Sequence, residues 1–315
     1  MRALQEILEA PIDEHVCESL EDAWSRYVSL AARVPRTFDR AVIAGFAADR
    51  LAWAFAGGYR SALDRLVPGL PRDAMVALAV TEKDGNTPRA IQTRLTTVEG
   101  ALVLDGDKRW TTLGPRASEL LVAARVEAEG AARPELRVVR VRANAPGVTI
   151  TPMHDAPFVP EIPHATVTLR GVEVEERDVF LGDGYDEVVK PFRTIEDVHV
   201  FGAALGHAVR ELRRRTLAGA TPDVNDKGRR AIERAAAAIA ALDALADART
   251  DAPFAHVTLA GAIEVGGEAF AGLDWVIAPA EDEAAVRLRR DRVLLSVAGK
   301  AREARRAKAW STLGS

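Results

Sequence analysis

Hydrophobic residues recur at helical spacing near both ends of the chain and at strand spacing between them. In residues 1–70 they return every three or four positions, as at Val16, Leu20, Trp24, Tyr27 and Leu30, which predicts helices. Residues 75–182 alternate short apolar runs with turn residues, a pattern typical of a β-barrel or a β-sandwich. The sequence therefore predicts helical segments on either side of a β region.

The last part of the chain carries four long amphipathic stretches joined by short connections. Such stretches predict an antiparallel helical bundle. The expected helices are 188–218, 226–248, 255–273 and 283–312. Small residues let helices approach closely, so we expect Gly202 and Gly206 on the first of these helices to serve packing.

Composition narrows the classes of function. The chain has 315 residues, 48% of them hydrophobic and 28% charged, and a net charge of −4, so no nucleic-acid partner is expected. Cys17 is the single cysteine, which excludes a disulfide within the chain. There is no apolar run long enough to span a membrane and no signal-peptide pattern at the start. A cytoplasmic protein without a membrane partner is expected.

The most informative stretch is 77–125. Residues 77–82 (ALAVTE) predict a strand ending at Thr81 and Glu82, and a turn-forming run follows. Residues 101–110 (ALVLDGDKRW) predict two strands joined by a tight turn at Asp105-Gly106, and 119–124 predict another strand. Trp110 beside Thr111 and Thr112 places an aromatic plate next to hydroxyl donors, which would suit a flat ligand.

Three motifs in this stretch occur in the order of a known family. They are Thr81-Glu82, the turn Gly85-Asn86-Thr87, and the run Gly106–Thr112 (GDKRWTT). Together they resemble the flavin-binding middle domain of the acyl-CoA dehydrogenase family, although Asn86 stands where that family has a serine. Residues 165–184 also resemble the family, with Val172, Leu181 and Gly184 among the matching positions.

The resemblance implies an α+β fold of three domains. It implies an N-terminal helical domain over 1–72, a middle antiparallel β-barrel over 73–185 and a C-terminal four-helix bundle over 186–315. It also implies FAD as the cofactor. The cofactor-binding residues that it implies are Leu78, Val80, Thr81, Gly85, Asn86, Trp110, Thr111 and Thr112.

The resemblance also points to a catalytic base. Most of the family carries a glutamate before the last helix, where this chain has Ala298. A subset carries it on the first C-terminal helix, and Glu196 keeps both the residue type and the spacing to Gly206. Glu196 would then take the proton alpha to the carbonyl of an acyl thioester, bound to CoA or to an acyl carrier protein. The alternative is an acid that favours an early helical turn.

Some family features are altered. Asp197 replaces the arginine that usually follows the base, and the adenine-side glycine motif survives only as Glu264–Phe270. Two other functions therefore stay open: a non-catalytic subunit of a hetero-oligomer, and a flavin-dependent monooxygenase or oxidase. The resemblance further implies a homodimer or homotetramer, an electron acceptor like electron-transfer flavoprotein, and a role in fatty acid metabolism.

No metal site is expected from the sequence. Five histidines do not pair with one another or with cysteine at metal-ligand spacing; they are His154, His164, His199, His207 and His256. Cys17 is expected to lie on a helix face and to be inert. The arginine clusters near 213 and 302 are expected to be solvated helix faces.

Overall fold

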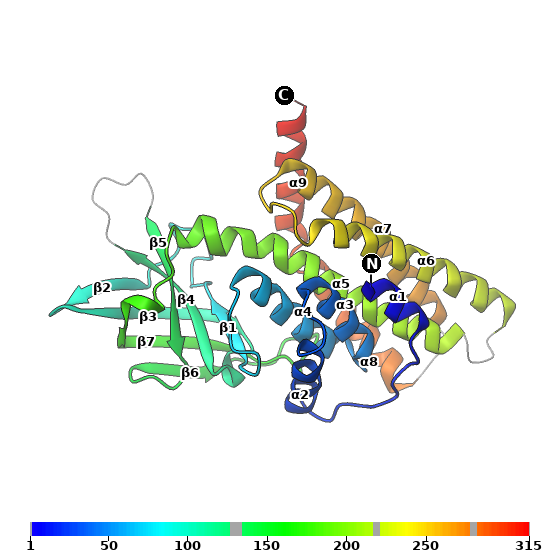
Figure 1. Cartoon of the computed structure of the whole chain (residues 1–315), viewed down its shortest axis with the longest axis horizontal. Helices are drawn as coiled ribbons and strands as arrows, with labels where there is room; N and C mark the ends of the chain where they lie inside the picture. The colour runs from blue at the N-terminus through cyan, green and yellow to red at the C-terminus, as the bar shows by residue number, and fades with distance from the viewer. Residues whose placement is uncertain (1, 127–133, 217–220, 278–281, 315) are drawn as a thin grey trace. The chain divides into compact units, whose positions relative to one another are not determined.

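The predicted helices and strands form two compact units in the computed structural model, which describes residues 2–126, 134–216, 221–277 and 282–314 (Figure 1). The helical unit comprises Met1–Arg72, Pro157–Val159 and Thr194–Ser315, and the sheet unit comprises Asp73–Ala156 and Pro160–Arg193. The helices before and after the sheet thus share one unit. The division into three domains stays a prediction.

The helical unit is built from nine described helices. They are α1 (Arg2–Glu9), α2 (Leu20–Ala31), α3 (Thr37–Ala47), α4 (Leu51–Leu66), α5 (Lys190–Thr216, of which the first four residues belong to the sheet unit), α6 (Pro222–Leu245), α7 (Pro253–Ile277), α8 (Glu283–Asp291) and α9 (Gly299–Leu313). Among the described helices, none is long and apolar enough to cross a membrane.

Glycines allow α3 to pack directly on α5. A Cβ added to Gly45 would lie 1.9 Å from the carbonyl oxygen of Ala203, and one added to Gly206 would lie 2.2 Å from that of Val42. Both distances are far below van der Waals contact, so any side chain at these positions would separate the helices. The expectation that Gly206 serves packing is confirmed, and so is that for Gly202, where an added Cβ would lie 2.7 Å from the Phe38 ring.

The single helix predicted over 283–312 is wrong. The structure has α8, a short 3₁₀ turn (Arg292–Ser296), and then α9. Asp291 at the end of α8 is fully buried, and its carboxylate accepts a hydrogen bond from the Val159 backbone N–H (2.7 Å) and pairs with Arg290. A buried polar anchor therefore marks the end of the helix, and apolar periodicity does not report such an anchor.

The middle region forms one seven-stranded sheet. Its strands are β1 (Val76–Ala79), β2 (Arg94–Val98), β3 (Ala101–Thr112), β4 (Glu119–Val126), β5 (Glu135–Arg142), β6 (Val148–Pro152) and β7 (His164–Val174). The order is β1-β4-β2-β3-β7-β6, with β5 also paired to β4. Alternate side chains from six strands, among them Ala77, Leu104, Val122 and Val167, form one buried cluster.

The predicted antiparallel barrel is therefore corrected in two respects. Among the described residues, β6 pairs with β7 alone, so the sheet is open. The sheet is also mixed, because β1 and β2 both run parallel to β4. Strand periodicity indicates which face of a strand is buried, but it does not indicate which strands pair.

The turn predicted at Asp105-Gly106 is also wrong. Strand β3 runs straight through these residues, with an irregularity in its register against β7. Gly106 is required for a different reason, because a Cβ there would lie 2.3 Å from Thr93 Oγ1. The hairpin turn is Glu99-Gly100, whose φ values are 51° and 87°, as a two-residue turn with positive φ at both positions requires.

A buried lysine joins three strands of this sheet. Lys108 on β3 has no exposed side-chain surface, and its Nζ lies 2.7 Å from Glu82 Oε1, 2.5 Å from the Ala123 oxygen and 3.4 Å from the Val80 oxygen. Glu82 also accepts hydrogen bonds from the Thr93 N–H and hydroxyl. Burial lowers the pKa of Lys108 to about 8, and the charge of Glu82 opposes this shift. Burial also works to raise the pKa of Glu82, but Lys108 and Thr93 outweigh it and hold that pKa below its usual value.

Replacing Gly45 by alanine should destabilise the helical unit. The added methyl collides with the α5 backbone, so we expect the free energy of unfolding to fall by about 3 kcal/mol, measured by urea denaturation followed by circular dichroism. Gly261→Ala is the matched control, because that exposed position on α7 has nothing within 4 Å of an added Cβ. The control should gain up to about 1 kcal/mol from helix propensity. Equal effects of the two variants would contradict the close packing.

Replacing Lys108 by methionine should destabilise the sheet unit. Glu82 would remain buried without its cationic partner, so we expect a loss of about 3 kcal/mol in the free energy of unfolding. Lys83→Met, at an exposed position in the adjacent turn, should change stability by less than about 0.5 kcal/mol. Denaturant titration of both variants tests the pair, and a Lys108→Met protein as stable as the wild type would show that Lys108 contributes no net stability.

Candidate functional site

Two of the motif segments meet at one end of the sheet. Strand β1 ends at Ala79, and the chain continues through Val80 and Thr81. The Arg109 backbone N–H donates to the Thr81 carbonyl oxygen at 2.7 Å, so the Thr81 backbone lies beside β3 one residue before Trp110. Leu78 and Val80 are buried, and Thr81 is half-buried. We call Thr81 and Trp110–Thr112 the strand-end cluster.

Trp110 is held in an unusual conformation in this cluster. The β3–β7 register shifts between Lys108 and Thr111, and Trp110 has a φ of 56°. Its indole stays 46% exposed and meets the rings of His154 and His164 edge to face, with centroid distances of 6.0 and 5.9 Å. The sequence gives these two histidines no role beyond the expectation that they bind no metal. Their contact with Trp110 depends on tertiary pairing, so no local signal points to it.

The two threonines differ in exposure. Thr112 is half-buried. Thr111 is 1% exposed, and its Oγ1 has no hydrogen-bond partner among the described residues. A buried hydroxyl without a partner is costly, so the Thr111 hydroxyl is a group that a ligand or a water molecule could satisfy.

The predicted turn at 83–88 is confirmed. Glu82 and Gly85 exchange two backbone hydrogen bonds, of 2.9 and 3.2 Å, and Gly85 has a φ of 116°. Asn86 is exposed, and its side-chain and backbone oxygens accept hydrogen bonds from Arg193 Nη2 at 2.9 and 3.1 Å. This contact fixes the turn where the family has its serine.

Glu196 belongs to the helical unit, on α5. Its side chain is half-buried, and the structure records no hydrogen bond or ion pair between it and any described residue. Burial raises its pKa to about 8, the charge of Asp197 adds to this rise, and Arg305 opposes it. A carboxyl group with a raised pKa and no partner has the character of a proton acceptor that works near neutral pH.

The neighbouring acid is held in a different way. Asp197 is 9% exposed, and its carboxylate accepts a hydrogen bond from Arg302 (3.1 Å) and forms an ion pair with Arg305, both on α9. These partners explain why Asp197 can be buried beside another acid. Arg302 and Arg305, which were expected on a solvated helix face, therefore bind the Asp197 carboxylate. Ala298 lies directly before α9 and offers no carboxylate there.

The comparisons with known proteins come from one family model and from solved structures. The model described as acyl-CoA dehydrogenase, middle domain, matches residues 77–172, which contain the strand-end cluster. No curated protein matches the chain by sequence.

Solved structures match the fold over nearly the whole chain. Butyryl-CoA dehydrogenase from Megasphaera elsdenii is 14% identical, with a TM-score of 0.73 over 98% of this chain and 92% of that one. The prolyl acyl carrier protein oxidase AnaB is 15% identical, with a TM-score of 0.71 over 100% and 97%. The FAD complex of PigA is 12% identical, with a TM-score of 0.73 over 98% and 92%.

At these identities the structural matches show the fold, and the family model shows the relationship of the sheet region. The family recognised from the sequence is thereby confirmed. The chain has the fold of the acyl-CoA dehydrogenase family, and its residues 77–172 match the middle domain of that family.

Proposed function

We propose that the protein is an FAD-dependent oxidoreductase that removes two hydrogens from the α and β carbons of an acyl thioester. The observation that carries this proposal is Glu196, a half-buried carboxyl group with a pKa raised to about 8 and no partner among the described residues. The carrier of the acyl group would be CoA or an acyl carrier protein. Solved structures named for enzymes that act on both kinds of substrate share the fold.

The strand-end cluster fits FAD. The Thr111 hydroxyl is buried without a partner among the described residues, and the partly exposed indole of Trp110 offers an aromatic surface. The other residues proposed to hold the cofactor are Leu78, Val80, Thr81, Gly85, Asn86 and Thr112. When bound, FAD accepts the hydride that leaves the β carbon.

Glu196 would perform the proton transfer. Its carboxylate takes the proton from the α carbon, and the electron pair of that C–H bond forms the α,β double bond as hydride leaves the β carbon. The product is an α,β-unsaturated thioester, and the glutamate leaves the step protonated. Asp197 does not compete for this role, because Arg302 and Arg305 already bind its carboxylate.

The remaining assignments also rest on the resemblance. We propose a homodimer or homotetramer, which light scattering of the purified protein would detect, and an electron acceptor like electron-transfer flavoprotein. A cytoplasmic location and a role in fatty acid metabolism belong to the same proposal.

Replacing Glu196 by glutamine should abolish the proton transfer while the yellow colour of bound flavin remains. We expect the turnover number to fall by a factor of about 10² to 10⁴, measured as anaerobic flavin bleaching against a panel of acyl-CoA and acyl-carrier-protein substrates. Glu233→Gln, at an exposed position on α6, should keep full activity. A Glu196→Gln enzyme that retains most of its turnover would remove Glu196 from the mechanism and favour an oxidase or monooxygenase reaction. A colourless wild-type protein would favour a non-catalytic subunit.

The activity should rise with pH, because the base works only when ionised. With the Glu196 pKa at about 8, the pH profile of kcat/KM in the free enzyme should have its rising limb centred near pH 8. Arg305 holds this pKa down, so Arg305→Gln should move the midpoint upward by roughly half a unit to one unit. Arg306→Gln, which removes an exposed partner of Glu303, should leave the midpoint unchanged. A midpoint near pH 4.5, or a downward shift in Arg305→Gln, would contradict the assignment.

A further inference from the structure

An acidic segment before α2 is held by hydrogen bonds at the start of α2 and to the link between α3 and α4. Ser19 caps α2 by accepting a hydrogen bond from the Asp22 N–H. The Cys17 backbone N–H donates to Asp49 Oδ1 at 3.2 Å, and its carbonyl oxygen accepts from Arg50 Nη2 at 3.0 Å. Cys17 thus lies in the loop before α2, not on a helix face as expected. Both backbone polar groups of Cys17 are therefore hydrogen-bonded, which fixes the loop at this residue.

Three side chains of this segment converge. The ring nitrogen of His15, the sulfur of Cys17 and a carboxylate oxygen of Asp22 all lie within 4.8 Å of one another. His15 Nε2 and Asp22 Oδ2 are 3.2 Å apart. Within the part of the chain that the structure describes, this is the one group of three or more such ligand atoms. The expectation of no metal site was drawn from other histidines, and His15 was not among them.

We propose that His15, Cys17 and Asp22 bind one divalent cation of the zinc class. A nitrogen, a sulfur and a carboxylate oxygen form a donor set that suits zinc, whereas magnesium and calcium prefer oxygen donors alone. Tetrahedral zinc with bonds of about 2.0 to 2.3 Å keeps its ligand atoms roughly 3.3 to 3.8 Å apart. His15 Nε2 and Asp22 Oδ2, at 3.2 Å, already lie close to this range, and the other pairs lie within 4.8 Å and would come closer on binding. Binding converts the Cys17 thiol to a thiolate and releases one proton.

The surrounding charges favour a cation. Residues 13–22 contain five acids and no lysine or arginine. The nearby arginines already have partners, because Arg26 pairs with Asp13 and Arg50 pairs with Asp49. The neighbouring positive charges are therefore compensated, and the carboxylate of Asp22 remains to offset the charge of an ion.

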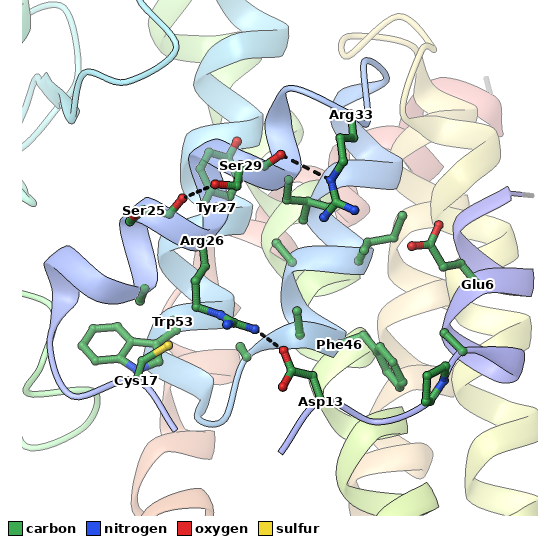
Figure 2. A pocket seen from close by; sticks show the side chains of 18 residues that line it. Glu6, Asp13, Cys17, Ser25, Arg26, Tyr27, Ser29, Arg33, Phe46 and Trp53 are labelled. Atoms are coloured by element: carbon green, nitrogen blue, oxygen red, sulfur yellow. Dashed lines mark hydrogen bonds and ion pairs between the residues drawn. The ribbon is translucent and has the colours of Figure 1, made fainter. Parts of the chain in front are cut away.

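One member of the group also borders a cavity. Cys17 lines a pocket of about 430 Å³ in the helical unit, together with Asp13, Arg26 and Trp53 (Figure 2). Three protein ligands leave one position of a tetrahedral ion for water or another small ligand. The pocket next to Cys17 offers room for that fourth ligand. The Trp53 Nε1, which is buried without a partner among the described residues, is a further donor on the pocket wall.

Zinc titration of the full-length protein tests the site. The protein, freed of any affinity tag and treated with a chelator that is then removed, is titrated with zinc chloride by calorimetry. We expect one ion per chain, with no displacement by excess magnesium. His15→Gln and Cys17→Ser should each weaken zinc binding at least about tenfold. His15 is exposed, so its variant should fold normally, as circular dichroism would show.

A matched acid in the same segment separates coordination from simple attraction. Glu18 is exposed, and its carboxylate is not part of the group, so Glu18→Gln should weaken zinc binding less than about threefold. Asp22→Asn should weaken it at least about tenfold. The proposal is wrong if the wild type binds no zinc, or if His15→Gln and Cys17→Ser bind as tightly as the wild type. It is also wrong if Glu18→Gln loses as much affinity as Asp22→Asn, because the Asp22 carboxylate would then only pair with His15 and accept the hydrogen bond of the Glu18 N–H.

Discussion

The burial of one ammonium group governs the arrangement of the sheet unit. A lysine without exposed surface needs an anionic partner and further acceptors, because an unpaired buried charge is very costly. Lys108 finds Glu82 after β1 and the carbonyl oxygen of Ala123 on β4. These contacts hold β1, β3 and β4 against one another at the point where Thr81 and Trp110 lie. The positive φ of Trp110 comes two residues after this anchor, so the fixed lysine helps to maintain the strained backbone next to it.

The helical unit uses the same principle to distinguish two adjacent acids. Asp197 stands where the family usually has an arginine, and arginines 105 and 108 residues later in the chain supply the positive charge instead. Glu196 receives no such partner among the described residues. Burial raises the pKa of both acids, but Arg305 and Arg302 oppose the rise at Asp197, where they bind the carboxylate. Such different environments let proteins assign separate roles to chemically similar residues. The positive charge next to the base position therefore comes from α9 and not from residue 197, and the carboxyl group of Glu196 stays free to accept a proton.

Local features of this chain could be predicted from sequence, whereas features that depend on distant partners could not. The helices, most strands and the turn at Gly85 follow from periodicity and turn chemistry. The sequence does not reveal that Gly106 is needed for close approach to Thr93 and that Glu99-Gly100 makes the turn, because this depends on strand pairing. The open sheet and the end of α8 at Asp291 have the same kind of cause. The grouping of His15 with Asp22 is different, since both lie within one short segment and their spacing is visible in the sequence.

A polar group without a partner indicates a functional site only when no nearby charge or polar group compensates it. Arg210 and Glu211, deep in α5, also have unpaired atoms among the described residues. They lie 3.8 Å apart, so each still experiences the charge of the other and the structure can retain both without a ligand. The carboxyl group of Glu196 has no comparable ion pair, and the hydroxyl of Thr111 has no described acceptor or donor. Natural proteins rarely keep a buried hydroxyl unsatisfied unless a ligand or water completes it, so Thr111 supports the proposed cofactor site. Glu196 supports the proposed proton transfer through its raised pKa and the lack of an ion pair to any described residue.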